Sequence, residues 1–170
     1  MKSRTTFTLS ELVAGAERRA KRLDSKLEAE GAEFLVLGLL LVEGIQATKA
    51  YTRFPGYDLL AFNPDAGRTC RIQVKSRWAT DYDRAFPIKN FDSDFVVHVA
   101  LNRGYRHSRR LRLDGRQPPR VYVLPVKVVR TAQDPKSSWG KVRLTDIPDA
   151  DEYVDNWPLI RKFLRLPELL

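Results

Sequence analysis

Cysteine is nearly absent from this chain of 170 residues, in which Cys70 is the single example. One thiol excludes an internal disulfide and a zinc cluster of thiolates, and it is typical of a reducing compartment. Histidine occurs only as His98 and His107, at no spacing typical of a zinc site. The nine glycines include no glycine-rich phosphate loop, which argues against a nucleotide-binding ATPase.

Long hydrophobic runs are also missing. The longest, FLVLGLLLV at 34–42, is too short to span a bilayer. The first residues, MKSRTTFTLSEL, contain no apolar signal-peptide core. We therefore expect a cytoplasmic protein with no membrane partner. With 170 residues and 43% hydrophobic composition, a single domain over 1–170 with a sizeable core is expected.

Acidic residues are in deficit, because 21 Asp and Glu face 30 Lys and Arg, a formal charge of +9. Such an excess favours a polyanionic partner, and the arginine fork suits phosphate. Between 101 and 130 there are nine basic residues and one acid, Asp114, so nine minus one leaves +8 in this segment. A solvated loop is the plain alternative.

We expect the loop at about 102–120 to be the main contact with DNA, and the basic stretch at 18–22 to be a lesser one. RNA stays open as an alternative partner, and binding should weaken steeply with salt. The arginines expected to contact nucleic acid are Arg103, Arg106, Arg109, Arg110, Arg112, Arg116, Arg18, Arg19 and Arg22.

The order of predicted elements indicates an α/β fold with a mixed central β-sheet flanked by helices. Apolar residues surround nearly all of 34–42, so this helix is expected to be covered on most sides. Trp139 and Trp157 are expected as core anchors. Helices are predicted at about 10–23, from Lys26 or Glu30 to Glu43 and from Pro158, with strands at 46–51, 57–62, 69–75, 95–101 and 121–124 and a short helix or turn at 127–130.

The turn sequence NPDAG at 63–67 predicts a hairpin that places Asp58 opposite Gln73. Directly opposed side chains share a face, and Lys75, two residues further on, shares it as well. The opposite face of this hairpin is nearly all apolar. A carboxylate, an amide and an ammonium therefore converge in front of a buried back, although a solvent-exposed strand face would give the same pattern.

This group suits metal-assisted hydrolysis of a phosphodiester. Asp58, Gln73 and the Val74 carbonyl offer the oxygen ligands that Mg²⁺ prefers, with Mn²⁺ as an alternative. A metal there would bind a phosphate oxygen and acidify a water. Lys75 would stabilise charge on the phosphorane or orient the attacking water.

The stretch PGYDLLAFNPDAGRTCRIQVKS at 55–76 resembles the PD-(D/E)xK nuclease superfamily, the fold of restriction endonucleases and archaeal Holliday-junction resolvases. In that superfamily one strand carries the Asp, the next carries (E/D/Q)-x-K, and a preceding helix often supplies a Glu. GAEFLVLGLLLVEG at 31–44 is similar to that helix. The resemblance implies a site made of Glu33, Asp58, Gln73 and Lys75, with Mg²⁺ bound and Glu33 among the metal ligands.

The chain departs from this pattern at Gln73, where the superfamily more often has an acid. The departure leaves two functions open: a Mg²⁺-dependent DNA endonuclease, and an inactive nucleic-acid-binding module with the nuclease fold. A third is a protein-interaction subunit whose basic loop binds an acidic partner. A homodimer would suit the cutting of both strands. For the helix glutamate, Glu28, Glu30 and Glu43 are alternatives to Glu33.

Overall fold

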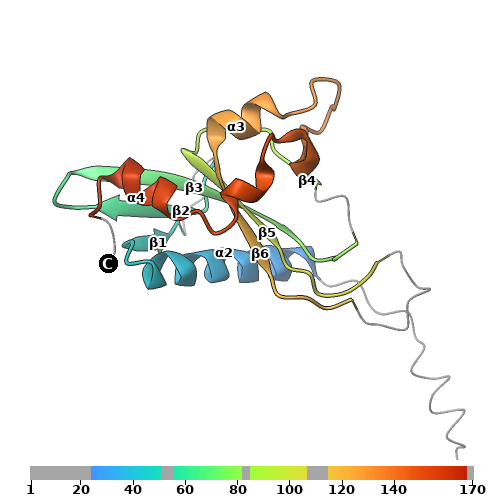
Figure 1. Ribbon diagram of the computed structural model, residues 1–170, viewed down its shortest axis with the longest axis horizontal. Coiled ribbons are helices and arrows are strands. Elements are labelled where there is room, and N and C mark those ends of the chain that lie inside the picture. Colours follow the sequence, from blue (N-terminus) through green and yellow to red (C-terminus); the bar gives the residue numbers. More distant parts are fainter. Residues whose placement is uncertain (1–23, 51–55, 82–84, 107–114, 168–170) are drawn as a thin grey trace, which may run out of the picture.

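A five-stranded mixed sheet, of strand order β1-β2-β3-β5-β6, forms the centre of the protein (Figure 1). The computed structural model describes residues 24–50, 56–81, 85–106 and 115–167. Strands β3 and β5 run parallel, and the other neighbours are antiparallel. The predicted mixed sheet is confirmed. Its strands are β1 (Ala47–Lys49), β2 (Leu59–Asn63), β3 (Arg68–Arg77), β5 (Phe95–Ala100) and β6 (Arg120–Pro125).

The hairpin of β2 and β3 has the register that its turn sequence predicts. Leu59 pairs with Ile72, and Phe62 pairs with Thr69. At the turn, Gly67 has φ 58°, a conformation that glycine adopts at little cost. This register fixes which side chains of β3 face each side of the sheet.

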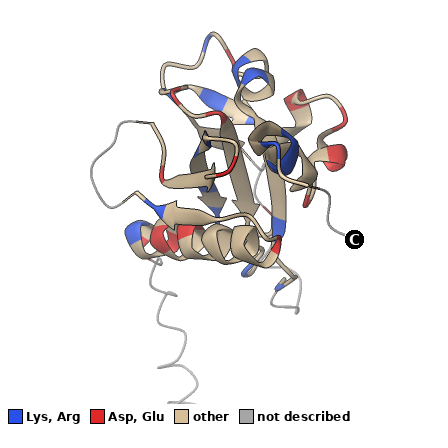
Figure 2. Cartoon of the chain, turned by 90° about the vertical axis from the view of Figure 1, so that its left-hand side faces the viewer, with Lys and Arg blue, Asp and Glu red and all other residues tan. Residues whose placement is uncertain are grey.

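Helix α2 (Ser25–Val42) covers one face of the sheet, burying Ala32, Val36 and Leu40. Its N-cap is Asp24, whose carboxylate accepts a hydrogen bond of 2.9 Å from the Lys26 N–H. All its charged residues lie in its N-terminal half (Figure 2). Helix α4 (Pro158–Leu164) adds Ile160 and Leu164 to the same core, together with Trp157, which is 3% exposed as predicted.

The opposite face of the sheet has a core of its own. Val96, Tyr122 and Leu124 pack there against Val129 and Val142. The covering elements are α3 (Val126–Thr131), a small sheet of β4 (Ala85–Pro87) with β7 (Lys141–Arg143), and the 3-10 turns η1 (Leu144–Asp146) and η2 (Ala150–Tyr153).

Two predictions about burial are wrong. Trp139 is 44% exposed, with the Lys141 ammonium over its ring, and is not a core anchor. The helix at 34–42 is not covered on most sides, since Leu41 is 54% and Val42 81% exposed on its outer face. Composition predicts that an apolar residue is buried somewhere, but it does not say against what.

Part of the sequence prediction lies outside the described residues. The helix expected at 10–23 falls on residues that the structure does not describe, and these include Arg18, Arg19 and Arg22. The same holds for Arg109, Arg110 and Arg112 of the basic loop. Across the described part of the chain, no helix combines the length and apolarity needed to cross a bilayer.

Candidate active site on the open side of strand β3

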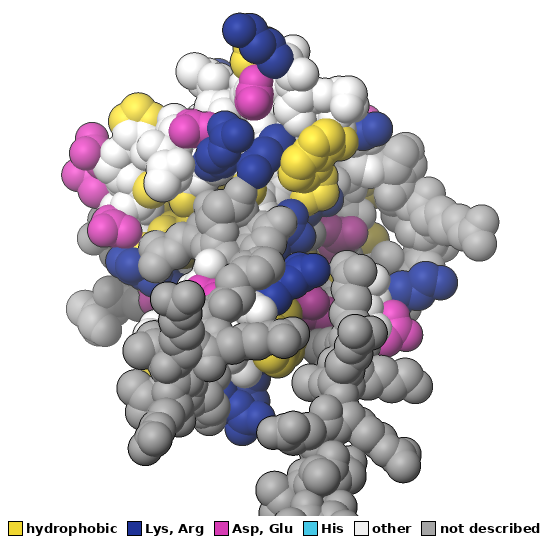
Figure 3. Space-filling view, turned by 90° about the vertical axis from the view of Figure 1, so that its right-hand side faces the viewer, with side chains coloured by type: hydrophobic (Ala, Val, Ile, Leu, Met, Phe, Trp, Pro, Cys, Tyr) yellow, Lys and Arg dark blue, Asp and Glu magenta, His cyan; other side chains and the backbone are white. Residues whose placement is uncertain are grey.

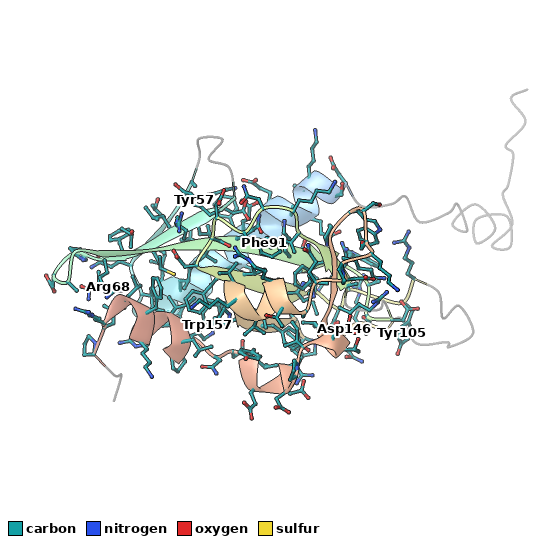
Figure 4. The ribbon with its side chains drawn as sticks, turned by 90° about the horizontal axis from the view of Figure 1, so that it is seen from above. Tyr57, Arg68, Phe91, Tyr105, Asp146 and Trp157 are labelled. Atoms are coloured by element: carbon teal, nitrogen blue, oxygen red, sulfur yellow. The ribbon has the colours of Figure 1, made fainter. Side chains whose placement is uncertain are left out.

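Strand β3 has ten residues and β2 has five, so the second half of β3 extends past β2. Asp58 stands at this corner, directly before β2. Its N–H donates to the Ile72 carbonyl at 2.9 Å, and its Oδ2 accepts from the Val74 N–H at 2.7 Å. Tyr57, the preceding residue, lies well away from Arg68 at the turn (Figure 4). The carboxylate is thus fixed at the end of the hairpin remote from its turn.

The second oxygen of Asp58 remains available. Within the described ranges, Oδ1 has no hydrogen-bond partner. In an antiparallel ladder the N–H and the C=O of one residue point toward the same neighbouring strand, so the Val74 carbonyl faces the same open side as the Val74 N–H that contacts Asp58. A carboxylate oxygen and a peptide oxygen therefore share this corner.

Gln73 and Lys75 lie on the face of β3 opposite to α2, beside Val96 and His98 of β5. Gln73 is only 9% exposed, and its Oε1 is buried with no hydrogen-bond partner. A buried amide oxygen in this state costs free energy unless a donor or a cation satisfies it. The Gln73 carbonyl is thus an oxygen donor that the described residues leave unused.

The Lys75 ammonium is half-buried and has no carboxylate within ion-pair distance among the described residues. Burial lowers the pKa of Lys75, the negative charges of Asp58 and Glu33 oppose that change, and the positive charge of Arg77 adds to it. An amine near two carboxylates but paired to neither is suited to contact an anion that enters from solvent.

Glu33 reaches this region from α2. Its Oε2 lies 3.0 Å from the Nζ of Lys49, which also contacts the Glu30 carboxylate. Lys49 is 9% exposed, and its ammonium lies 4.6 Å from the centre of the Phe34 ring. Lys49 therefore fixes the position of Glu33, and sequence reasoning missed it. The sequence shows only a lysine in a short strand of weak pattern, and a lysine in such a strand is usually exposed to solvent.

The four glutamates of the helix region differ in what they contact. Glu28 accepts a hydrogen bond from the Ser76 hydroxyl at 3.1 Å, and Glu43 forms the C-terminal cap of α2. Glu33 is the one whose charge acts on Lys75, and Asp58 in turn acts on it. The structure thus groups Asp58, Val74 and Lys75 at one corner. Gln73 is the neighbour of Val74 on β3. Glu33 does not touch this group, but it is close enough for its charge to act on Lys75.

Replacing Glu33 by glutamine is expected to stabilise the fold near neutral pH. Burial raises the pKa of Glu33 above its ordinary value of 4.5, against the lowering effect of Lys49. The folded state therefore binds more protons than the unfolded state, so stability falls as the pH rises from 4.5 through the folded pKa. Glutamine has no charge to bury, and Glu30 remains to pair with Lys49.

Thermal unfolding of Glu33→Gln and wild type, from pH 4 to pH 8, measures this effect. We expect the difference in Tm to grow with pH and to reach at most about 4 °C, the shift that about 1 kcal/mol produces in a domain of this size. Glu152→Gln removes the same charge from an exposed position and should show no such trend. A Glu33→Gln protein less stable than wild type across the whole range would contradict the interpretation.

Gly56 determines how the chain enters the site. Its φ is 97°, and a Cβ there would lie 2.9 Å from both the Asn90 Oδ1 and the Asp92 Cβ. Only glycine fits both the conformation and the space. The loop before β5 thus presses directly on the segment that leads to Asp58.

His98, the neighbour of Lys75 on β5, is fully buried. Its ring stacks on the Phe86 ring with 4.8 Å between centroids. The centroid of the Tyr122 ring lies 6.1 Å from that of His98. This packing is that of a structural histidine.

The base of the basic loop lies close to this corner. Arg103 and Arg116 form an antiparallel bridge, and the Arg103 N–H donates to the Trp78 carbonyl. Trp78 follows Lys75 by three residues, about 10 Å along a strand. Lys and Arg side chains gather on this side of the molecule (Figure 3). The exposed arginines of the loop among the described residues are Arg103, Arg106 and Arg116.

Known proteins resemble the chain in structure. No protein-family model and no curated protein sequence matches it. A bacterial homing endonuclease, I-Ssp6803I, superposes with a TM-score of 0.53 and 22% identity, over 82% of this chain and 92% of that one. The Holliday junction resolvase Hjc of the archaeal hyperthermophile Archaeoglobus fulgidus gives 0.45 and 15%, over 84% and 99%.

The chain has the restriction endonuclease-like fold, as its sequence predicted. In this chain, Asp58, Val74 and Lys75 lie at the corner where β2 begins beside β3.

Proposed function

We propose that this protein is a metal-dependent endonuclease that hydrolyses phosphodiester bonds in DNA. The observation that carries the proposal is the corner at β3, where the Asp58 carboxylate, the unused Gln73 carbonyl and the Lys75 ammonium stand together. The nuclease fold supports it.

The donors at this corner fit Mg²⁺, with Mn²⁺ as an alternative. Asp58, Gln73 and the Val74 carbonyl are all oxygen donors, which hard cations prefer. Among residues 24–50, 56–81, 85–106 and 115–167, no three His, Cys, Asp or Glu side chains gather in metal-binding geometry. A set with one carboxylate suits Mg²⁺, which keeps several waters and needs few protein ligands. When bound, the ion would polarise a phosphate oxygen and lower the pKa of a water.

The protein's own groups would do the remaining work. The Lys75 ammonium would contact the scissile phosphate and stabilise the charge that develops on it during attack. Asp58 is held by the Val74 N–H and presents its other oxygen to the site without reorganisation. Glu33 would act through its charge on Lys75, because Lys49 holds its carboxylate.

The basic loop would bring the substrate to this corner. Trp78, whose carbonyl accepts from the Arg103 N–H at the base of the loop, is about 10 Å from Lys75 by strand spacing, less than one turn of a DNA duplex. Arginine can bind a phosphate through two parallel hydrogen bonds, which fixes position as well as charge. DNA held by the loop would thus pass over the site.

A DNA-binding module without catalysis is the second candidate. Gln73 and the lack of a three-acid cluster among the described residues favour it, because both reduce the attraction for a divalent ion.

Incubation of the purified protein with supercoiled, linear and branched DNA tests the two candidates. Cleavage of at least one of them in Mg²⁺ or Mn²⁺, lost on addition of a chelator, is expected of the endonuclease. Salt-sensitive DNA binding with no cleavage of any substrate would favour the second candidate. The metal is added alone and in excess, so that weak affinity at Gln73 does not hide activity.

A further inference from the structure

Helix α2 carries an apolar stripe that the described part of the chain leaves largely exposed, with the Lys49 ammonium over the Phe34 ring. The stripe consists of Leu27, Gly31, Phe34, Gly38 and Leu41, whose alternating spacing of four and three places them along one side of the helix. Leu27 is 65%, Phe34 48% and Leu41 54% exposed. By helix periodicity this outer stripe lies on the side of α2 opposite to the buried Ala32, Val36 and Leu40. No other described element lies on that side of the helix (Figure 1).

Packing within the described residues does not require glycine at either glycine position of the outer stripe. A Cβ on Gly31 or Gly38 would meet nothing within 4 Å. Each glycine nevertheless destabilises a helix interior relative to alanine. Both lie where the backbone of α2 is open to an approaching partner, and glycine allows two helices to come close together.

We propose that the outer stripe is the contact surface for the same helix of a second copy of this chain, packed antiparallel. With a two-fold axis at the level of Val36, Phe34 of each copy lies opposite Gly38 of the other. Leu41 then lies opposite Gly31 of the other. Each bulky side chain enters the gap above a glycine.

A parallel pair fits less well. It would stack Gly38 on Gly38 and Phe34 on Phe34, so that gaps alternate with collisions, and the two helix dipoles would align unfavourably. In the antiparallel pair, the charged N-terminal half of one helix faces the uncharged half of the other, so Glu28 and Glu30 do not meet their own copies. The stripe is thus complementary to itself, as a two-fold interface requires.

Sedimentation of the full chain over a concentration series tests the contact. We expect a dimer with a dissociation constant on the order of 10 μM, as suits a small interface. Gly38→Leu adds apolar surface yet should raise this constant at least about tenfold, because the added side chain fills the gap that Phe34 needs. Its Tm should not fall, since leucine favours helix over glycine.

Thr145→Leu is the matched control, because it adds a leucine at an exposed position outside α2. It should leave the dissociation constant unchanged. A chain that stays monomeric at 100 μM, or a Gly38→Leu chain that associates more strongly, would overturn the contact.

Cross-linking with a short bismaleimide tests the orientation, and the native Cys70 is buried and gives little background. In the antiparallel pair the two copies of residue 38 are offset by four residues, about 6 Å. The two copies of residue 27 are offset by eighteen residues, about 27 Å. Gly38→Cys should therefore cross-link and Leu27→Cys should not. Efficient cross-linking of Leu27→Cys would show a parallel pair and overturn the arrangement.

Discussion

Replacing Lys75 by alanine is expected to lower metal-dependent DNA cleavage by about 10²–10³-fold, the usual effect of removing one group that stabilises transition-state charge. Lys75 is half-buried beside Asp58 and pairs with no carboxylate of the described residues, so its ammonium is available to a phosphate. Initial rates on the best substrate, at saturating metal, measure the change.

The fold should tolerate this substitution. Burial lowers the pKa of Lys75, so keeping its ammonium charged costs stability at neutral pH, and the cost declines as the pH rises through the folded pKa toward 10.5. Alanine has no such cost, so the Tm should not fall sharply. Lys136→Ala removes the same charge from an exposed loop and should keep wild-type cleavage. Equal rates for wild type and Lys75→Ala would exclude Lys75 from catalysis.

Replacing Asp58 by asparagine should abolish metal binding and reduce cleavage at least about 10²-fold. Asparagine keeps an oxygen that can accept from the Val74 N–H, so the corner of the hairpin should retain its shape. It removes the single carboxylate charge that the proposed donor set contains, and that charge dominates the attraction for a divalent ion.

Calorimetric titration with Mn²⁺ and initial rates of cleavage measure the two effects on the same protein. Asp65→Asn makes the same chemical change in the exposed turn at the other end of β2 and should leave both unchanged. DNA binding should survive in Asp58→Asn, because the arginines of the basic loop are untouched. Wild-type metal binding in Asp58→Asn would place the metal elsewhere.

The sequence was most informative at the hairpin. The turn at 63–67 and the alternation of β3 fix the pairing of Leu59 with Ile72, and this pairing brings Asp58 toward Gln73. Local turn chemistry and a period of two suffice for that prediction. The three-residue strands β4 and β7 were not predicted, because a segment so short shows no periodicity.

Two features depend on tertiary contacts that no local pattern encodes. Lys49 was overlooked because its role depends on Glu30 and Glu33, nineteen and sixteen positions before it. The outer face of α2 was expected to be buried because apolar composition does not distinguish a cover within the chain from one supplied by another molecule. In both cases the local pattern does not say what the residue faces in the folded protein.

Asp58 is held by a backbone N–H of β3 and not by a side chain, and this affects which mutations the site tolerates. The Val74 N–H holds Asp58 whatever side chain residue 74 carries. Among single substitutions there, proline alone removes that hydrogen. Substitutions at position 74 are thus limited by packing against the core and hardly at all by the hydrogen bond to Asp58. At Asp58 and Lys75 the side chain itself is required, so these positions should not vary.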